Sequence, residues 1–153
     1  MIKKIKNLKT DFLIVGSGIA GLSLAIKLSE LGKVTIITKK QKAESNTNYA
    51  QGGIATVFAD DDTFDLHIKD TLDCGAGLCN VKSVEKIVTE GPQRIKELIE
   101  LGVHFSKEHG EISLGKEGGH SRNRILHSRD LTGKEIERAL LHKISLIPKI
   151  KIY

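Results

Sequence analysis

The sequence predicts an α/β fold in which a parallel sheet is flanked by helices. Three observations lead to this prediction. A short apolar run, Phe12–Val15, enters the glycine-rich turn Gly16–Gly21; a helical pattern of apolar residues follows the turn; and a second apolar run covers Val34–Thr38. Strands that alternate with helices in this way are typical of parallel sheets. Because such strands are covered on both faces, we expect Phe12–Val15 to be buried on both sides.

The turn carries the spacing Gly-x-Gly-x-x-Gly between the first strand and the first helix. In this context Gly16 permits a tight turn, Gly18 allows the backbone to approach a pyrophosphate, and Gly21 allows the helix to pack closely on the strand. The free amides and positive dipole end of the helix would face the phosphates. The sequence therefore predicts a dinucleotide site. The apolar side of the helix is expected to be formed by Leu22, Ala25, Ile26 and Leu28.

The end of the second strand lacks the acidic residue that usually binds the ribose hydroxyls of NAD. It reads Thr38-Lys39-Lys40 instead. Two interpretations remain open from these residues. The lysines could bind the 2′-phosphate of NADP, or the chain could belong to a flavoprotein class that holds the adenosine ribose in another way.

The composition is that of an ordinary globular protein. Of 153 residues, 39% are hydrophobic and 28% are charged, and the net charge is +5. With 4% aromatic residues and no basic stripe, nucleic-acid binding is not expected, and no apolar run approaches a membrane span. The lysine-rich residues 1–10 are expected to be a solvated lead-in without a signal peptide. Cys74 and Cys79 have no second pair for a zinc site, so we expect reduced, partly buried thiols and no metal.

The middle of the chain reads as a loop followed by helices. Residues 39–53 form a long polar connection. Asp60–Asp62 is expected to start a helix, with Phe64, Ile68 and Leu72 as its buried stripe. Asn80 is expected to cap a second helix whose apolar face is Val81, Val84, Ile87 and Val88. Pro92 is expected to open a third helix, which ends at Gly102 and turns Ile95, Leu98, Ile99 and Leu101 inward.

The last third of the chain returns to the sheet. Val103–Phe105 and Glu111–Leu114 are expected to form a hairpin around His109-Gly110, followed by a polar loop over residues 115–130. Asp130 and Thr132-Gly133 read as the start of a helix with Ile136, Ala139, Leu140 and Ile144 on one side. His67 and His142 are expected at helix surfaces or half-buried. A third strand begins at Ile150, so we expect residues 11–153 to be the N-terminal part of a larger domain, or a truncated gene product.

Three motifs in register carry a resemblance to a known family. The segment Asn46–Ala55, with Lys39 before it, resembles the fumarate reductase/succinate dehydrogenase flavoprotein family. Within that family, Tyr49–Ala55 and Glu117–Arg122, followed by Arg124–His127, are similar to the L-aspartate oxidase branch. The resemblance implies a Rossmann-like FAD-binding domain as the N-terminal part of a two-domain flavoenzyme, whose second FAD half and substrate domain lie outside these residues.

The resemblance also implies a cofactor site. Its dehydrogenase members carry a histidine joined covalently to FAD where this chain has Asn46, so FAD is expected to bind non-covalently. The pyrophosphate loop would lie at Gly16–Gly21, the adenosine side at Lys39, and the flavin side at Asn46–Gly53. The residues assigned to FAD are Gly16, Ser17, Gly18, Ile19, Ala20, Gly21, Lys39, Asn46, Thr47, Asn48, Tyr49, Ala50, Gln51, Gly52 and Gly53.

The activity implied is oxidation of L-aspartate to iminoaspartate, with O2 or fumarate as electron acceptor, in the first step of cytoplasmic NAD biosynthesis. Quinolinate synthase would take the product. Glu117 would orient the substrate through its α-ammonium group, and no catalytic acid or base can be named within these residues. The basic residues His120, Arg122, Arg124 and His127 either attract substrate carboxylates or pair with acids such as Asp130. The alternatives are a fumarate reductase-like or succinate dehydrogenase-like fragment and a non-catalytic nucleotide-binding remnant.

Overall fold

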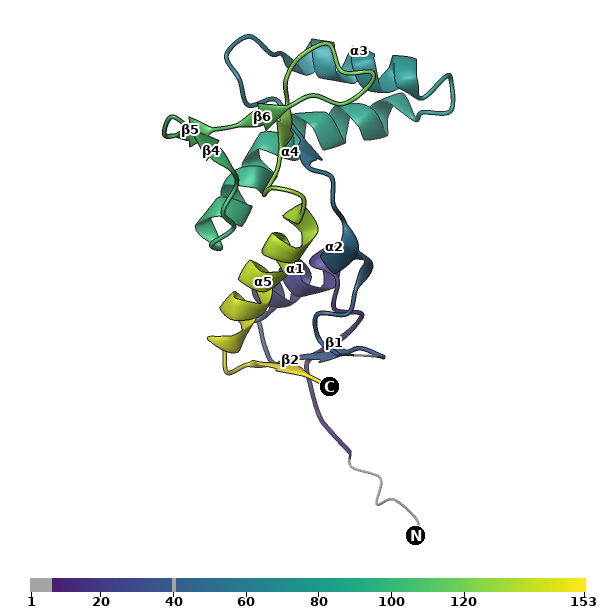
Figure 1. The fold of residues 1–153 in the computed structure, drawn as a ribbon. Coiled ribbons are helices and arrows are strands. Elements are labelled where there is room, and N and C mark those ends of the chain that lie inside the picture. Colours follow the sequence, from purple (N-terminus) through teal and green to yellow (C-terminus); the bar gives the residue numbers. More distant parts are fainter. Residues whose placement is uncertain (1–6, 40) are drawn as a thin grey trace.

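A three-stranded parallel sheet forms one end of the molecule in the computed structural model, which describes residues 7–39 and 41–153 (Figure 1). Strand β2 (Val34–Ile37) lies between β1 (Phe12–Val15) and β8 (Ile150–Ile152). Phe12 is in register with Val34, and Val34 with Ile150. The predicted parallel sheet and its third strand are confirmed. Most of the predicted lead-in, residues 1–6, and Lys40 lie outside the described residues.

Two helices cover one face of this sheet. Helix α1 (Ile19–Leu28) and helix α5 (Thr132–Ser145) pack against each other and against the face that carries Ile14. The predicted apolar sides of both helices are confirmed, because Leu22, Ala25, Ile136, Ala139, Leu140 and Ile144 are all buried. The prediction that β1 is buried on both faces was wrong, because Leu13 is 61% exposed and Val15 is 78% exposed. The described helices cover only the opposite face.

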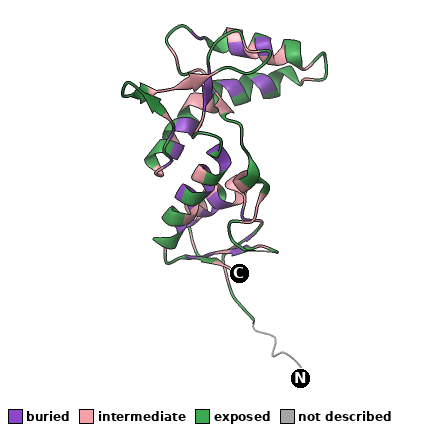
Figure 2. Cartoon of the chain, viewed as in Figure 1, coloured by how far each residue is buried: buried purple, intermediate pink, exposed green. Residues whose placement is uncertain are grey.

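The other end of the molecule is formed by α3 (Phe64–Cys74), α4 (Val81–Glu100) and small antiparallel sheets. One sheet joins β3 (Ile54–Ala55), β7 (Ile125–Leu126) and β6 (Leu114–Gly115), and the other is the hairpin of β4 (Lys107–Glu108) and β5 (Glu111–Ile112). Buried residues, purple in Figure 2, extend from the parallel sheet through α5 into α4. One apolar core therefore connects both ends.

Helix α4 is a single helix, although the sequence predicts a break at Pro92. Pro92 lies inside it, and Val88 and Ile95 on either side are buried in the apolar interior. Packing on both sides of the proline outweighs the loss of one helical hydrogen bond. The predicted cap is confirmed, since the Asn80 side chain accepts a hydrogen bond from the Ser83 amide at 3.0 Å. The predicted inward face holds only in part, because Val81, Ile87 and Ile99 are exposed.

Helix α3 starts later than predicted and buries a different face. Its N-cap is Thr63, whose hydroxyl accepts from the Leu66 amide, and not the Asp60–Asp62 run. Phe64 is 41% exposed, while the buried residues of α3 are His67 and Asp70. The expectation that His67 lies at the helix surface or is half-buried was therefore wrong. Both cysteines are free thiols, and Cys74 is exposed where partial burial was expected.

The loops contain more structure than the sequence predicts. The hairpin turns at His109-Gly110 as predicted, but its first strand is β4, and Val103 and Phe105 are part of the core. The connection 39–53 contains the short helix α2 (Asn46–Tyr49), and the polar loop 115–130 contains β7. Helix α5 begins at Thr132, close to the predicted start, but its N-cap is Leu131 without a side-chain cap, so Asp130 does not cap it. No helix within the described residues has the length and apolarity to cross a membrane.

Candidate functional site

The glycine turn has the geometry that the sequence predicts for close backbone approach. Gly16 has a φ of 106°, which favours glycine, and its amide donates to the Ile37 carbonyl at 2.8 Å. A Cβ on Gly21 would contact the Gly16 carbonyl oxygen, so glycine is required for α1 to begin directly over the turn. A Cβ on Gly18 would lie 3.3 Å from Thr47 Oγ1. The turn is therefore held close to both β2 and α2.

The N-terminus of α1 is capped from a distant segment. Gly18 is the N-cap and has no side chain, and the first turn contains no acidic residue. Instead, the amide of Ile19 donates to Thr47 Oγ1 at 3.1 Å. The other amides at a helix N-terminus, together with the positive end of the helix dipole, make a binding position for phosphate. The arrangement joins the glycine turn to α2 and leaves this end of α1 suited to an anion.

A cavity of ≈ 690 Å³ lies beside this turn. It is at the carboxyl ends of β1 and β2, where α/β sheets bind their ligands. Ser17 is buried, and its hydroxyl donates to Thr38 Oγ1 at 3.1 Å, which joins the turn to the end of β2. The predicted site residues that line the cavity are Gly16, Ser17, Gly18, Lys39, Asn46 and Thr47. The remaining lining residues are Val15, Ile37, Thr38, Glu44 and Ser45.

The residues around this cavity fit a dinucleotide. Glycines form the cradle at the helix N-terminus, where a side chain on Gly18 would fill the space toward Thr47. Lys39, exposed at the end of β2, adds a positive charge at the cavity rim. Backbone amides, a helix dipole and one cation together match a pyrophosphate with an attached nucleoside.

The segment Asn46–Gly53 connects the two ends of the molecule. It begins as α2, whose N-cap Ser45 accepts a hydrogen bond from the Asn48 amide at 3.2 Å. It ends at Gly53, where a Cβ would contact Ile125 and Leu126 of β7. The residues after α2, from Ala50 to Gly53, are exposed. The predicted flavin-side segment therefore runs from the cavity to the β3–β7–β6 sheet along an exposed path.

A buried acid beneath α2 was missed by the sequence reasoning. Glu137 on α5 is 1% exposed, and its Oε2 accepts a hydrogen bond from Ser45 Oγ at 2.6 Å. Burial raises the pKa of Glu137 against the lowering effect of the hydrogen bonds from Ser45 and Asn48. The signal was available, because an acid at position 137 shares a helix face with Gly133, Leu140 and Ile144.

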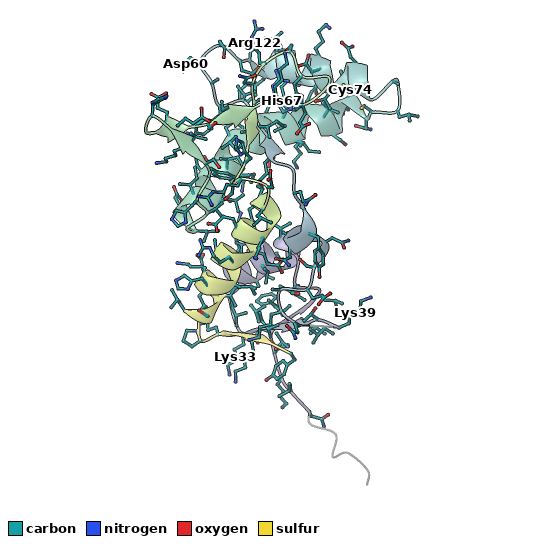
Figure 3. The ribbon with its side chains drawn as sticks, viewed as in Figure 1. Lys33, Lys39, Asp60, His67, Cys74 and Arg122 are labelled. Carbon is teal, nitrogen blue, oxygen red and sulfur yellow. The ribbon has the colours of Figure 1, made fainter. Side chains whose placement is uncertain are left out.

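Glu117 lies at the other end of the molecule from the glycine turn. It is exposed in the loop after β6, and its carbonyl accepts from the His120 amide at 3.1 Å. Among the described residues, its carboxylate has no hydrogen bond or ion pair. Figure 3 shows Lys39 near the parallel sheet and Arg122, from the same loop as Glu117, at the far end. The structure thus brings the turn, Lys39 and α2 together, and leaves Glu117 apart from them.

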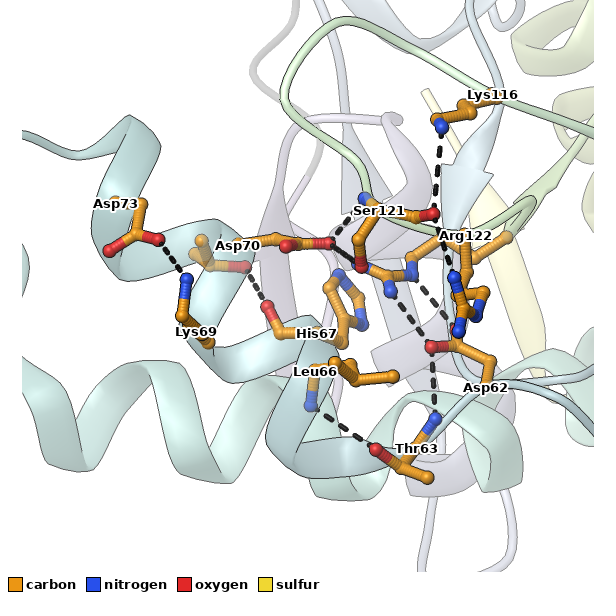
Figure 4. A network of polar contacts seen from close by, with 12 residues as sticks. Asp62, Thr63, Leu66, His67, Lys69, Asp70, Asp73, Lys116, Ser121 and Arg122 are labelled. Atoms are coloured by element: carbon orange, nitrogen blue, oxygen red, sulfur yellow. Dashed lines mark hydrogen bonds and ion pairs between the residues drawn. The ribbon is translucent and has the colours of Figure 1, made fainter.

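A buried ion-pair network holds the loop that carries Glu117 (Figure 4). Arg124 is fully buried and donates two hydrogen bonds to Asp62, at 2.9 and 2.8 Å, and one to Asp70 at 2.7 Å. Asp70 also accepts from the amide and hydroxyl of Ser121, at 2.7 and 2.8 Å. Burial alone would raise the pKa of Asp70, but the hydrogen bonds from Ser121 and Arg124 lower it to about 2. The network ties the loop to α3.

Of the two alternatives for the basic cluster, pairing with acids is confirmed for Arg124 and Arg122, although the partners differ from the expected Asp130. Arg124 is bound by Asp62 and Asp70 and not by Asp130, and its burial removes it from any substrate. The partner of Arg122 is Asp61, with Nε 3.6 Å from its carboxylate. A local sequence pattern gives no signal for these pairs, because the partners are 54 to 62 positions apart along the chain.

Comparison with known proteins agrees with this geometry. The model of the family described as "FAD binding domain" matches residues 11–152. The chloroplastic L-aspartate oxidase of Oryza sativa subsp. japonica is 49% identical over 144 residues, which cover 94% of this chain and 22% of the relative. The L-aspartate oxidase of Yersinia pestis is 47% identical over 148 residues, covering 94% and 28%. The chain thus spans about a quarter of these relatives.

Solved structures give the same result. A quinol fumarate reductase of E. coli superposes with a TM-score of 0.90 at 30% identity, covering 97% of this chain and 26% of that one. A Mycobacterium smegmatis Sdh1 complex gives a TM-score of 0.89 at 30% identity, covering 97% and 28%. Of the two interpretations of Lys39, these matches favour the flavoprotein, and the expectation of FAD is confirmed. The chain belongs to the family of FAD binding domains.

Proposed function

We propose that the protein containing this chain oxidises L-aspartate to iminoaspartate with non-covalently bound FAD. The observation that carries the proposal is the exposed carboxylate of Glu117, which is unpaired among the described residues and sits on a loop held by the buried Arg124 network. An amino-acid substrate offers an ammonium group for such a carboxylate, and a dicarboxylate such as succinate does not. Similarity to L-aspartate oxidases over 94% of the chain supports the same substrate.

Different segments of the chain would bind different parts of FAD. The amides at the N-terminus of α1 bind the pyrophosphate, and Lys39 at the end of β2 lies on the adenosine side. The segment Asn46–Gly53, which is exposed apart from the half-buried Thr47 and Asn48, would run along the flavin, and its backbone amides would stabilise negative charge on the ring. Asn46 has no nucleophilic ring nitrogen, so it forms no covalent bond to the cofactor. Bound FAD supplies the two-electron oxidising capacity.

Glu117 is assigned the task of orienting the substrate. Its carboxylate binds the α-ammonium group and fixes which face of the substrate is presented for oxidation. The Asp70–Ser121 hydrogen bonds, at 2.7 and 2.8 Å, fix the loop on which it lies. We assign no catalytic acid or base to the described residues.

The acceptor and the product's fate complete the proposal. Either O2 or fumarate takes up the electrons, and the fold shared with a quinol fumarate reductase supports fumarate. Iminoaspartate then passes to quinolinate synthase in NAD biosynthesis, in the cytoplasm. Similar proteins named chloroplastic occur in plants, so this location is proposed from the bacterial relatives.

The substrate is tested with the purified, FAD-loaded protein under anaerobic conditions. Flavin absorbance at about 370 and about 450 nm is expected, and L-aspartate is expected to bleach the second band. Succinate is the matched dicarboxylate without an ammonium group and is expected to leave it unchanged. Bleaching by succinate alone would support the second candidate, a succinate dehydrogenase-like flavoprotein, which the 30% identity with Sdh1 favours. Failure to bind FAD would support a non-catalytic remnant.

The role of Glu117 is tested by replacement. Glu117→Gln keeps the shape and removes the charge, so KM for L-aspartate is expected to rise about 10- to 100-fold, the value of a charged hydrogen bond. FAD content is expected to be unchanged. The control Glu108→Gln removes another exposed carboxylate, on β4, and is expected to leave KM unchanged. Loss of FAD in Glu117→Gln would instead show a structural role.

A further inference from the structure

Glu137 combines deep burial with an incomplete set of partners. It is 1% exposed on α5, and its Oε2 accepts from Ser45 Oγ at 2.6 Å. Its other oxygen, Oε1, is buried and has no partner among the described residues. A buried ionised carboxylate normally requires a cation or a full set of hydrogen bonds. The donors to Glu137 are the Ser45 hydroxyl and the Asn48 amide, and Oε1 remains empty, an environment that suits a neutral carboxylic acid.

No charged group within the described residues faces Glu137 from the elements packed on it. Helix α2 contains no charged residue; its one titratable group, the Tyr49 hydroxyl, donates to Glu44 at 3.0 Å. On α1 the only charged residue is Lys27, which pairs with Glu97. On α5 the neighbouring Arg138 pairs with Glu135. The raised pKa of Glu137 is accordingly caused by burial and not by a neighbouring charge.

The contact of Glu137 lies at the start of the segment that is assigned to the cofactor. Ser45, its hydrogen-bond partner, is the N-cap of α2. Two residues further on, Thr47 caps α1 by accepting from the Ile19 amide at 3.1 Å. A Cβ on Gly133 of α5 would contact the Thr47 carbonyl, so α2 lies directly on α5. Glu137, Ser45, Thr47 and Ile19 thus form a continuous path from the buried acid to the glycine turn.

We propose that Glu137 is a positioning residue of the FAD site, which in its neutral form holds α2 on α5 and which, on ionisation, loosens α2 and weakens FAD binding. An ionised Glu137 needs water, and water reaches it only if α2 moves away from α5. That movement withdraws Thr47 from Ile19 and disturbs the turn that faces the pyrophosphate. The proposal rests on the proposed function only in placing FAD at this cavity.

The first test measures FAD affinity against pH by flavin fluorescence, in the purified protein freed of FAD and reloaded. For the wild type we expect the Kd to rise with pH above the pKa of Glu137, by at most about tenfold per pH unit because one proton is involved. Glu137→Gln is neutral at every pH, so its Kd is expected to remain level. Ser45→Ala breaks the path, so weaker binding with a reduced pH dependence is expected.

Glu135→Gln is the matched control on the same helix. The hydrogen bond from Arg138 is the main cause that lowers the pKa of Glu135 to about 2, so it is ionised throughout the range tested. Its replacement is expected to leave the pH dependence of the Kd as in the wild type. A wild-type slope that persists in Glu137→Gln, or a Ser45→Ala variant that behaves like the wild type, would overturn the proposal.

The second test needs no FAD and separates this proposal from the proposed function. The folded-state pKa of Glu137 lies above the ordinary 4.5, so the contribution of Glu137 to the stability of the FAD-free protein is fully present below pH 4.5 and is lost as the pH rises through the folded value. Glu137→Gln is expected to remove this loss. Equal profiles for the two proteins would overturn the role of Glu137. Absence of FAD binding in every variant, with the unfolding difference present, would overturn the cofactor site alone.

Discussion

The side-chain oxygen of Thr47 accepts a hydrogen bond from the backbone amide of Ile19 at 3.1 Å, across 28 positions of the chain. Gly18 is the N-cap residue of α1 but has no side chain that could accept a hydrogen bond, so Thr47 of α2 supplies the acceptor. The glycine turn and the segment that follows β2 are therefore one structural unit. A change at Thr47 should consequently affect both.

Replacing Thr47 by valine keeps the shape and removes the acceptor. The amide of Ile19 then loses its partner at a partly buried position, and the free energy of unfolding is expected to fall by about 1 kcal/mol, the usual value of a helix cap. Urea unfolding followed by circular dichroism measures this change. Thr47→Ser retains the hydroxyl and is expected to lose less than half as much. A valine variant as stable as the wild type would show that the hydrogen bond between Ile19 and Thr47 does not contribute to stability.

Adjacent glycines should respond differently to a methyl group. A Cβ on Gly53 would contact Ile125 Cγ2 and the Leu126 carbonyl, whereas a Cβ on Gly52 would meet open space. Gly53→Ala is expected to destabilise the protein by about 1–3 kcal/mol through overpacking. Gly52→Ala is expected to change stability by less than about 0.5 kcal/mol. The midpoints of thermal unfolding of the two variants measure this difference. Similar midpoints would contradict the close approach of Gly53 to β7.

The part of the fold that follows from local patterns could be predicted from sequence. The order of β1, α1 and β2 follows from apolar runs around a glycine turn, and the buried side of α5 follows from helical spacing. The family resemblance, and not a local pattern, assigned Lys39 and Thr47 to the cofactor, and the structure brings both to one cavity.

The rest depends on contacts that local patterns do not contain. Arg124 reads as a charged residue of a polar loop, and its burial follows only from Asp62 and Asp70, which lie 62 and 54 positions away. Pro92 reads as a helix start, but packing of Val88 and Ile95 carries α4 past it. In both cases tertiary packing outweighs the local preference.

Stability at acid pH should depend on Asp70. Its folded-state pKa is about 2 against an ordinary 3.8, so its carboxylate stabilises the fold above about pH 4, and this contribution is lost as the pH falls toward 2. Asp70→Asn cannot ionise. We expect it to be less stable than the wild type at pH 7 and to approach the wild type as the pH falls below 4. Thermal midpoints from pH 7 to pH 2 measure this. A constant difference at all pH values would show that the Arg124 network does not depend on the Asp70 charge.

Pro92 and Gly91 should respond in opposite directions to alanine. Pro92 lies inside α4, where proline makes the helix about 3 kcal/mol less stable than alanine does. Alanine also gives the unfolded chain more conformational freedom than proline does, which lowers the free energy of unfolding by about 1 kcal/mol. Pro92→Ala is therefore expected to stabilise the protein by about 1–2 kcal/mol. Gly91→Ala also improves helix propensity, but its Cβ would lie 2.7 Å from Oγ1 of the buried Thr56. Because Thr56 is fully buried, its side chain has little space into which it could shift, and we expect Gly91→Ala to destabilise the protein. Urea unfolding of both variants provides the measurement, and stabilisation by both would show that propensity, and not the contact with Thr56, dominates at this point of α4.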